Sequence, residues 1–171
     1  MIEKIISGGQ TGVDRAALDI AIDLGIPHGG WCPKDRLSEA GAIPNQYSLQ
    51  ETASMDYSER TKLNIRDSDG TLVVVPTFPL QVTDGTALTL QELQEKNKPF
   101  FIVDISKGFN LDQFNSWVQQ NNIKILNVAG PRESQSPGIY KKSTELLPKL
   151  LVDALKKDMD TQIDRELDRD I

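Results

Sequence analysis

The fold of this chain is constrained most by a regular alternation of short apolar runs with amphipathic segments. The clearest apolar run is TLVVV at Thr71–Val75, which is typical of a strand buried on both faces of a parallel sheet. Further strands are expected at Ile2–Ile6, Phe100–Asp104 and Ile123–Val128. A short strand is expected at Ile26–Trp31, although Pro27, Gly29 and Gly30 make it a poor one. Because parallel strands need crossover connections, the intervening helices cover both sheet faces. The sequence therefore predicts a doubly wound α/β fold whose mainly parallel sheet has at least five strands.

The segments between these runs carry helix signals. Apolar residues recur at helical spacing from Val13 to Leu24, and Gly25 stands where a C-terminal glycine belongs. Further helices are expected at Tyr57–Asp67, Thr83–Lys96, Asn110–Asn121 and from near Gly138. No linker divides the chain, so residues 1–155 are predicted to form one domain.

Residues 156–171 are predicted to be a charged tail or helix extension. Its apolar residues recur every fourth position, at Met159, Ile163, Leu167 and Ile171. A strict four-residue step drifts around a helix of 3.6 residues per turn, so these residues do not form one clean face. The tail is either a solvated, fraying helix end or a subunit contact.

Charge and the scarcity of cysteine and histidine exclude several functions. The chain has 25 acidic and 19 basic residues and a net charge of −6, which argues against general nucleic-acid binding. One cysteine and one histidine exclude an intrachain disulfide and any site that needs two histidines. No apolar run approaches the roughly 20 residues of a membrane span, and the N-terminus does not resemble a signal peptide. A cytoplasmic location without membrane contact is therefore expected.

Three strand-to-helix turns carry the unusual residues: SGGQTG at Ser7–Gly12, TDGT at Thr83–Thr86 and AGPRE at Ala129–Glu133. Because the carboxyl ends of parallel strands share one sheet edge, the three turns should meet there. Glycine lets the backbone approach a ligand, and the free N–H groups of a helix start favour phosphate or another oxyanion. SGGQTG alone is weak evidence for a ligand site, since a glycine-rich first turn is often only a tight turn.

Four side chains near these turns have two interpretations each. Arg15 and Arg132 could each donate two N–H groups to an oxyanion. For either arginine, a surface salt bridge is about as plausible. Cys32 has a soft thiolate that suits metals, but a lone cysteine is usually just buried. His28 lies four residues from Cys32, too far for a Cys–His pair in an extended chain. We therefore expect Cys32 not to bind a metal and His28 not to act as a base.

The motifs together resemble the molybdenum carrier family, whose better-known members are molybdenum-cofactor carrier proteins. The resemblance runs from Ile5 to about Leu151, through SGGQTGVDRAALD, GGWCPKDRLSEAGAIPNQYSLQET, RTKLNIRDSDGTLVVV, DGTALT and NVAGPRESQSPGIY. It implies a Rossmann-like fold related to the lysine-decarboxylase-like phosphoribohydrolases. It also implies molybdenum cofactor (molybdopterin with its molybdenum) as bound cargo, molybdoenzymes as recipients, and assembly into homo-oligomers, specifically tetramers.

The cargo-binding residues implied by this resemblance lie on and around the three turns. The phosphate is expected on Gly8–Gly12 with Gly85 and Thr86 opposite, and Asn64, Asp67 and Asn127 are candidates for reading the pterin edge. The full candidate set is Ser7, Gly8, Gly9, Gln10, Thr11, Gly12, Arg15, Lys34, Asn64, Asp67, Asp84, Gly85, Thr86, Asn127, Gly130, Arg132 and Glu133.

One departure from the related hydrolases bears on activity. Those enzymes carry P-G-G-x-G-T-x-x-E, and Thr89 stands here where their glutamate would be. A hydroxyl cannot replace a carboxylate as general base or oxocarbenium stabiliser. The sequence therefore favours a non-catalytic carrier that protects and delivers the cofactor. The alternatives are a nucleotide-binding sensor module and a nucleoside-monophosphate phosphoribohydrolase of related fold.

Overall fold

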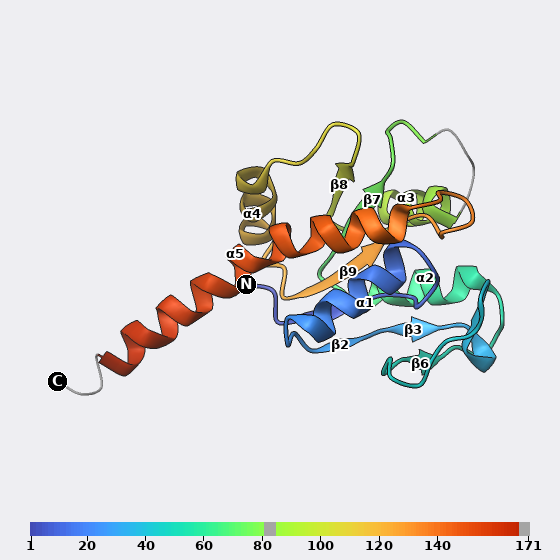
Figure 1. Ribbon diagram of the computed structural model, residues 1–171, viewed down its shortest axis with the longest axis horizontal. Helices are drawn as coiled ribbons and strands as arrows, with labels where there is room; N and C mark the ends of the chain where they lie inside the picture. Colours follow the sequence, from blue (N-terminus) through green and yellow to red (C-terminus); the bar gives the residue numbers. More distant parts are fainter. Residues whose placement is uncertain (81–84, 168–171) are drawn as a thin grey trace.

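The computed structural model describes the backbone at residues 1–80 and 85–167, and side-chain surroundings at residues 1–80 and 85–153. Strands and helices alternate along the chain (Figure 1). The elements are β1 (Lys4–Ile6), α1 (Val13–Asp23), β2 (His28–Gly29), β3 (Trp31–Cys32), the 3₁₀ helix η1 (Lys34–Arg36), β4 (Leu37–Ser38), β5 (Gly41–Ala42), β6 (Gln50–Glu51), α2 (Tyr57–Arg66), β7 (Gly70–Val75), α3 (Gly85–Glu95), β8 (Phe100–Asp104), α4 (Leu111–Gln120), β9 (Ile125–Ala129) and α5 (Ile139–Leu167).

The central sheet has five strands in the order β2-β1-β9-β7-β8, and every neighbouring pair is parallel. The last strand of the chain, β9, lies at the centre, between β1 and β7. If the strands were numbered from β9 onward, the same order would read 3-2-1-4-5, which is the doubly wound order of dinucleotide-binding folds. The strands therefore have the same order in space as in those folds, but this chain begins and ends at different points of the sheet.

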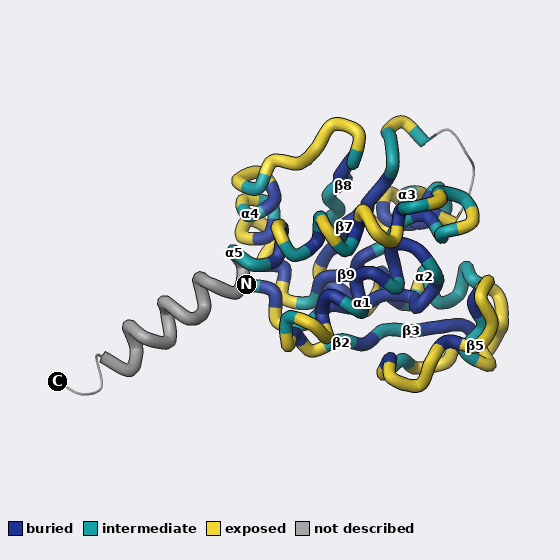
Figure 2. Tube along the Cα trace, in the orientation of Figure 1, coloured by how far each residue is buried: buried dark blue, intermediate teal, exposed yellow. Residues whose placement is uncertain are grey.

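Helices cover both faces of the sheet, as predicted. Along β7, Leu72 and Val74 join the larger core, which includes residues of α1, α4 and α5. Val73 and Val75 point the other way, into a smaller core with Ile65 of α2 and Leu93 of α3. Both layers hide the sheet from solvent (Figure 2). The continuous apolar run of β7 follows from burial on both sides.

The strand expected at Ile26–Trp31 is interrupted. Gly30 has φ +127°, and a Cβ there would lie 2.3 Å from the carbonyl oxygen of Ser7. The chain bends at this glycine, so β2 pairs with β1 while β3 pairs with β6 in a separate two-stranded sheet. This second sheet belongs to the irregular region between residues 32 and 58, which packs a third, small core against Leu18 of α1.

Two helix ends agree with the glycine signals of the sequence. Gly25 has φ +69°, its N–H donates to Ile22 O at 3.1 Å, and the N–H of Ile26 donates to Ala21 O at 2.8 Å. This pair of bonds is the Schellman ending that Gly25 predicts. The last helix begins at Ile139, directly after Gly138.

The apolar side chains of the tail, from Met159 to Ile171, lie outside the described side chains. Both interpretations of the tail therefore stay predictions. In the described part of the chain, no helix combines the length and apolar character needed to cross a membrane.

Candidate functional site

A cleft of about 160 Å³ opens at the carboxyl edge of the sheet, beside the central strand β9. The turn after β1, the start of α3 and the end of β9 all border it, so the three glycine turns meet as their strand positions predict. Helix α2 forms the remaining wall. The lining residues are Gly8, Gln10, Asp14, Tyr57, Arg60, Thr61, Asn64, Gly85, Thr86, Leu88, Thr89, Asn127, Val128, Ala129, Gly130, Arg132 and Gln135.

Glycine is required where the first and third turns pack together. A Cβ at Gly12, which has φ +79°, would lie 2.3 Å from the carbonyl oxygen of Pro131. A Cβ at Gly130 would lie 2.3 Å from Val74 O. The N–H of Val13 donates to the same Pro131 carbonyl at 3.2 Å. The two turns are therefore held as one unit against the end of β7.

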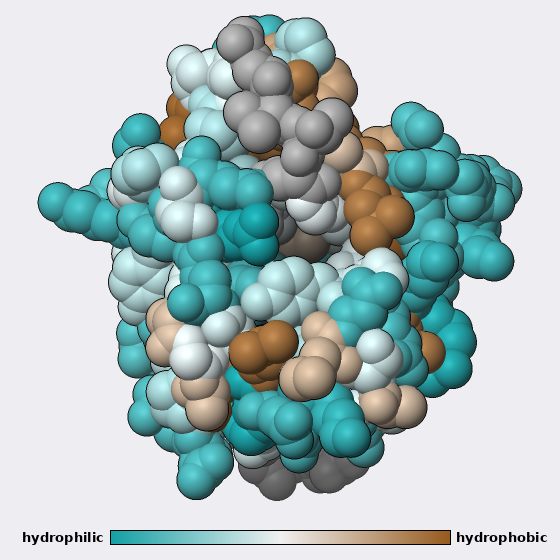
Figure 3. All heavy atoms as spheres, turned by 90° about the vertical axis from the view of Figure 1, so that its right-hand side faces the viewer, coloured by the Kyte–Doolittle hydropathy of each residue, from teal (hydrophilic) through white to brown (hydrophobic). Residues whose placement is uncertain are grey.

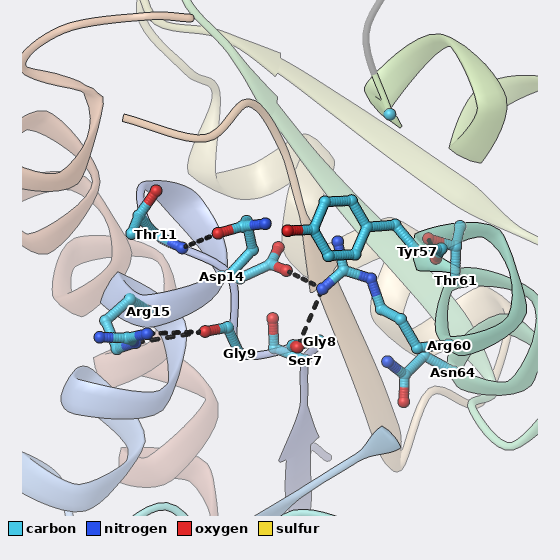
Figure 4. Close-up of polar contacts among 12 residues, drawn as sticks. Ser7, Gly8, Gly9, Thr11, Asp14, Arg15, Tyr57, Arg60, Thr61 and Asn64 are labelled. Carbon is cyan, nitrogen blue, oxygen red and sulfur yellow. Dashed lines mark hydrogen bonds and ion pairs between the residues drawn. The ribbon is translucent and has the colours of Figure 1, made fainter. Parts of the chain in front are cut away.

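Arg60 of α2 is a cleft residue that the sequence analysis missed. Its Nη1 donates to the carbonyl oxygen of Gly8 at 2.9 Å and lies 3.5 Å from Oδ2 of Asp14, whose side chain is 9% exposed against 11% for Arg60. The guanidinium lies 5.2 Å from the ring centroid of Tyr57 (Figure 4). The available signal was the spacing of Arg60 and Asn64, since residues four apart share one helix face.

Asp14 is the second missed residue, and it changes what the first turn can offer a ligand. Burial raises the pKa of its carboxyl, opposed by Arg60 and by a hydrogen bond from the backbone N–H of Gln10. The Thr11 amide donates to Gln10 Oε1 at 3.0 Å. With the Val13 bond, three amides of this turn already have partners inside the protein. The phosphate expected on Gly8–Gly12 thus finds fewer free donors there than the sequence suggests.

The side-chain amide of Gln10 is only half used. Its Oε1 accepts the N–H groups of Thr11 and Glu39, each at 3.0 Å. Its Nε2 is buried and has no hydrogen-bond partner in the described part of the chain. Gln10 is only 4% exposed and is one of the residues that line the cleft, so the donor without a partner belongs to the wall of the cleft.

Glu39, in the β4–β5 hairpin, ties the cleft turns together. Its carboxylate accepts from the Thr11 hydroxyl, from the hydroxyl of Ser134 and from the Ser134 N–H at 3.1 Å. Arg132 Nε lies 3.7 Å from it. Burial alone would raise the pKa of Glu39, but these hydrogen bonds and Arg132 outweigh it and lower the pKa. The negative charge of Glu39 therefore partly offsets the positive charge of Arg132 at the cleft.

Three charged residues predicted for the site lie elsewhere. The guanidinium of Arg15 donates to Gly9 O at 2.9 Å and lies over the ring of Tyr47, on the other side of the first turn. Asp67 accepts from Trp31 Nε1 at 2.8 Å and pairs with Arg66. Lys34 lies exposed on η1. None of the three lines the cleft, because helix rotation and the course of the irregular region turn them away.

Other predicted residues support the cleft from outside it. The Ser7 hydroxyl donates to Val128 O at 2.8 Å, and Glu133 accepts the N–H groups of Gly138 and Tyr140 at the start of α5. Gly9, Thr11 and Gly12 shape the first turn without lining the cleft. Asp84 lies outside the described residues.

Asn64 and Asn127 do line the cleft, but their amides are partly engaged. Asn64 Oδ1 accepts the Trp31 N–H at 2.8 Å, and its Nδ2 donates to Trp31 O at 3.0 Å. Asn127 Nδ2 donates to the Thr71 hydroxyl at 3.2 Å. Asn64 thus anchors β3 to α2, which the sequence did not indicate.

Cys32, His28 and Thr89 each have a structural environment. Cys32 is fully buried among Leu18 and its neighbours, and burial raises the pKa of its thiol. His28 Nε2 accepts the Ser48 N–H at 3.1 Å. Thr89 borders the cleft with its hydroxyl donating to Gly85 O at 2.9 Å, so that hydroxyl is turned onto the helix backbone. Among the described residues, no three His, Cys, Asp or Glu side chains are grouped to hold a metal ion.

The permuted strand order and the three joined turns have a counterpart among known families. Residues 5–151 match the sequence model of the circularly permutated YpsA SLOG family. The chain belongs to this family. The name agrees with the sheet, in which the central strand β9 comes last in the chain. The predicted doubly wound, Rossmann-like α/β fold is thereby confirmed.

A solved structure is also similar to this SLOG chain over most of its length. It is the crystal structure of a "putative molybdenum carrier protein" from Syntrophus aciditrophicus SB, with 45% sequence identity and a TM-score of 0.81. The similarity covers 88% of this chain and 95% of that chain. The predicted resemblance to the molybdenum carrier family is therefore confirmed. No protein of curated function matches the chain.

Proposed function

We propose that this SLOG-family chain binds molybdenum cofactor as cargo in the cleft, protects it and passes it to molybdoenzymes without transforming it. The observation that carries the proposal is the meeting of three glycine turns with the guanidinium groups of Arg60 and Arg132 at one cleft. Backbone N–H groups and guanidinium groups are the donors that a phosphate-bearing ligand needs. The solved relative described as a molybdenum carrier supports this particular cargo.

The phosphate of the cargo is best placed at the start of α3. Gly85 borders the cleft, and among the described residues beyond its chain neighbours none lies within 4 Å of where its Cβ would be, so they leave room there for a ligand. The helix dipole favours negative charge at this end. The face seen in Figure 3, on the side of the molecule where α3 lies in Figure 1, is largely hydrophilic, with small separate hydrophobic patches.

The position of Thr89 supports binding without turnover. Its hydroxyl donates to the helix backbone, so it offers the cleft neither a general base nor a negative charge. The fold relatives that cleave nucleotides use a glutamate at this place. Asp14 is a cleft carboxylate, but Arg60 and internal hydrogen bonds already engage it.

A nucleotide is the second candidate ligand, favoured by the sheet itself. With β9 counted first, the strand order is that of dinucleotide-binding folds, and the cleft lies beside the strand where the order reverses. In that case the chain is a nucleotide-binding sensor module.

The deciding experiment offers the protein both ligands. After incubation with molybdenum cofactor and removal of unbound ligand, retained cofactor should reconstitute an apo-molybdoenzyme and outlast cofactor left free in buffer. AMP and GMP are incubated in parallel, with binding and release of free base both measured. Retention of nucleotide but not cofactor would establish the sensor, and release of base would establish a hydrolase. Light scattering on the same samples tests the tetramer that the family resemblance implies.

A further inference from the structure

The side-chain amide of Gln10 has an oxygen that accepts two hydrogen bonds and a nitrogen that makes none with the described residues. Two backbone N–H groups, from Thr11 and Glu39, donate to its Oε1 at 3.0 Å each. Its Nε2 lies buried with no hydrogen-bond partner among the described residues. A buried donor without a partner costs free energy, and such groups are rare in folded proteins unless something else completes them.

The orientation of this amide is fixed by its surroundings. Turning the amide over would place its NH₂ group against two N–H donors and lose both hydrogen bonds. Glu39, whose N–H is one of those donors, is itself held by Thr11 and Ser134. The β4–β5 hairpin therefore positions Gln10 so that Nε2 is presented as a donor and cannot act as an acceptor.

We propose that Gln10 is the specificity-determining donor of the cleft, and that its Nε2 donates to an uncharged acceptor, a carbonyl oxygen or ring nitrogen, on the heterocycle of the bound ligand. This assignment rests on the proposed function, because it takes the cleft to be the cargo site.

The acceptor is expected to be uncharged because the donor is a neutral amide in a buried part of the cleft wall. Gln10 is 4% exposed, and a charged group that leaves water beside it costs far more than a carbonyl oxygen or a ring nitrogen does. The start of α3 at Gly85, where the helix dipole favours negative charge, suits the phosphate better. The phosphate and the heterocycle are therefore expected at opposite sides of the cleft.

Gln10→Glu is the sharpest variant. The new carboxylate can still accept from Thr11 and Glu39, so the internal bonds that hold the turn are retained while the donor is lost. Because the new carboxylate is buried, we expect a lower melting temperature than that of wild type. At a temperature where the variant is fully folded, we expect a drop of more than about tenfold in its affinity for molybdenum cofactor, since the new acceptor would lie opposite the acceptor of the ligand. Gln10→Met, which removes the donor without adding charge, should lose about three- to tenfold. Gln119→Glu on the exposed face of α4 is the matched control and should bind as wild type does.

The side-chain amide resonance of Gln10 in a ¹⁵N NMR spectrum reports the contact directly, and Gln10→Met assigns it. Cofactor should shift this resonance, and inorganic phosphate alone should not. An equal shift with phosphate would overturn the assignment to the heterocycle. Unchanged affinity in both Gln10 variants, with wild-type binding intact, would overturn the role of Gln10. If wild type does not bind the cofactor at all, the proposed function fails instead, and the same titration with GMP tests Gln10.

Discussion

Asp14 combines burial with a position in the cleft wall, and its titration should be visible in stability. Because burial raises its pKa, the folded protein holds this proton at pH values where the unfolded chain has released it. Between the ordinary aspartate pKa and the raised one, the native state binds more protons, so the free energy of unfolding falls as pH rises. Urea unfolding across that window should show this slope, and Asp14→Asn should reduce it. An identical slope in the variant would contradict the assignment.

Arg132 and Arg15 lie on different sides of the first turn, so their variants test on which side the ligand binds. Arg132 borders the cleft, so Arg132→Ala should weaken cofactor binding by about 1.5–3 kcal/mol if it makes a charge-assisted contact. Arg15 donates to Gly9 O and lies over Tyr47, away from the cleft, so Arg15→Ala should change the affinity little. Equilibrium binding of both variants checks this pair. Loss of affinity only in Arg15→Ala would reverse the placement of the ligand.

At this scale, the sequence predicts which turns carry the site better than which side chains face it. Gly8, Gly85 and Gly130 follow from the topology, because strand ends of a parallel sheet share an edge. Arg60 and Asp14 were missed because their roles depend on how α1 and α2 are rotated about their axes. Arg15 lies outside this cleft for the same reason, since one residue along a helix turns a side chain by about 100°.

Among the elements, the junction of the first and third turns is where glycine should matter most. Gly12 and Gly25 both have positive φ, +79° and +69°, but only Gly12 has backbone, Pro131 O, within 2.3 Å of a Cβ. Gly25 has nothing within 4 Å. Gly25→Ala should therefore show only the backbone strain of about 1 kcal/mol, and Gly12→Ala should cost clearly more. Thermal or urea unfolding of the two variants measures the difference, and equal losses would mean that the turns can separate freely.

Elements with strong periodicity were predictable, and short ones were not. Helix α1 and its Gly25 ending, and the buried β7, follow from local pattern. The split of the expected Ile26–Trp31 strand depends on the approach of Gly30 to Ser7 O, a contact between segments far apart in the chain. No local pattern contains that information.

For the whole molecule, the strand order makes a prediction about where the chain can begin. Ile2 and Leu151 are both buried in the larger core, so both ends of the fold are anchored to the same cluster of side chains. A permutant that begins at Asn122 and joins residue 153 to Met1 through a flexible linker of about ten residues should keep the fold. Its far-UV circular dichroism and cofactor binding should match those of a chain truncated after residue 153, which is the control. Failure of the permutant alone would show that the present chain order is needed for folding.

The central place of β9 also has a consequence for synthesis on the ribosome. The strands β1 and β7 emerge first, and each must wait for the strand that lies between them, since β9 is the last to leave the ribosome. Until then the edges of β1 and β7 that will face β9 are unpaired, and such edges invite pairing with other chains. The nascent protein therefore cannot complete its sheet in two separate halves, and its exposure to misassembly lasts until β9 has emerged.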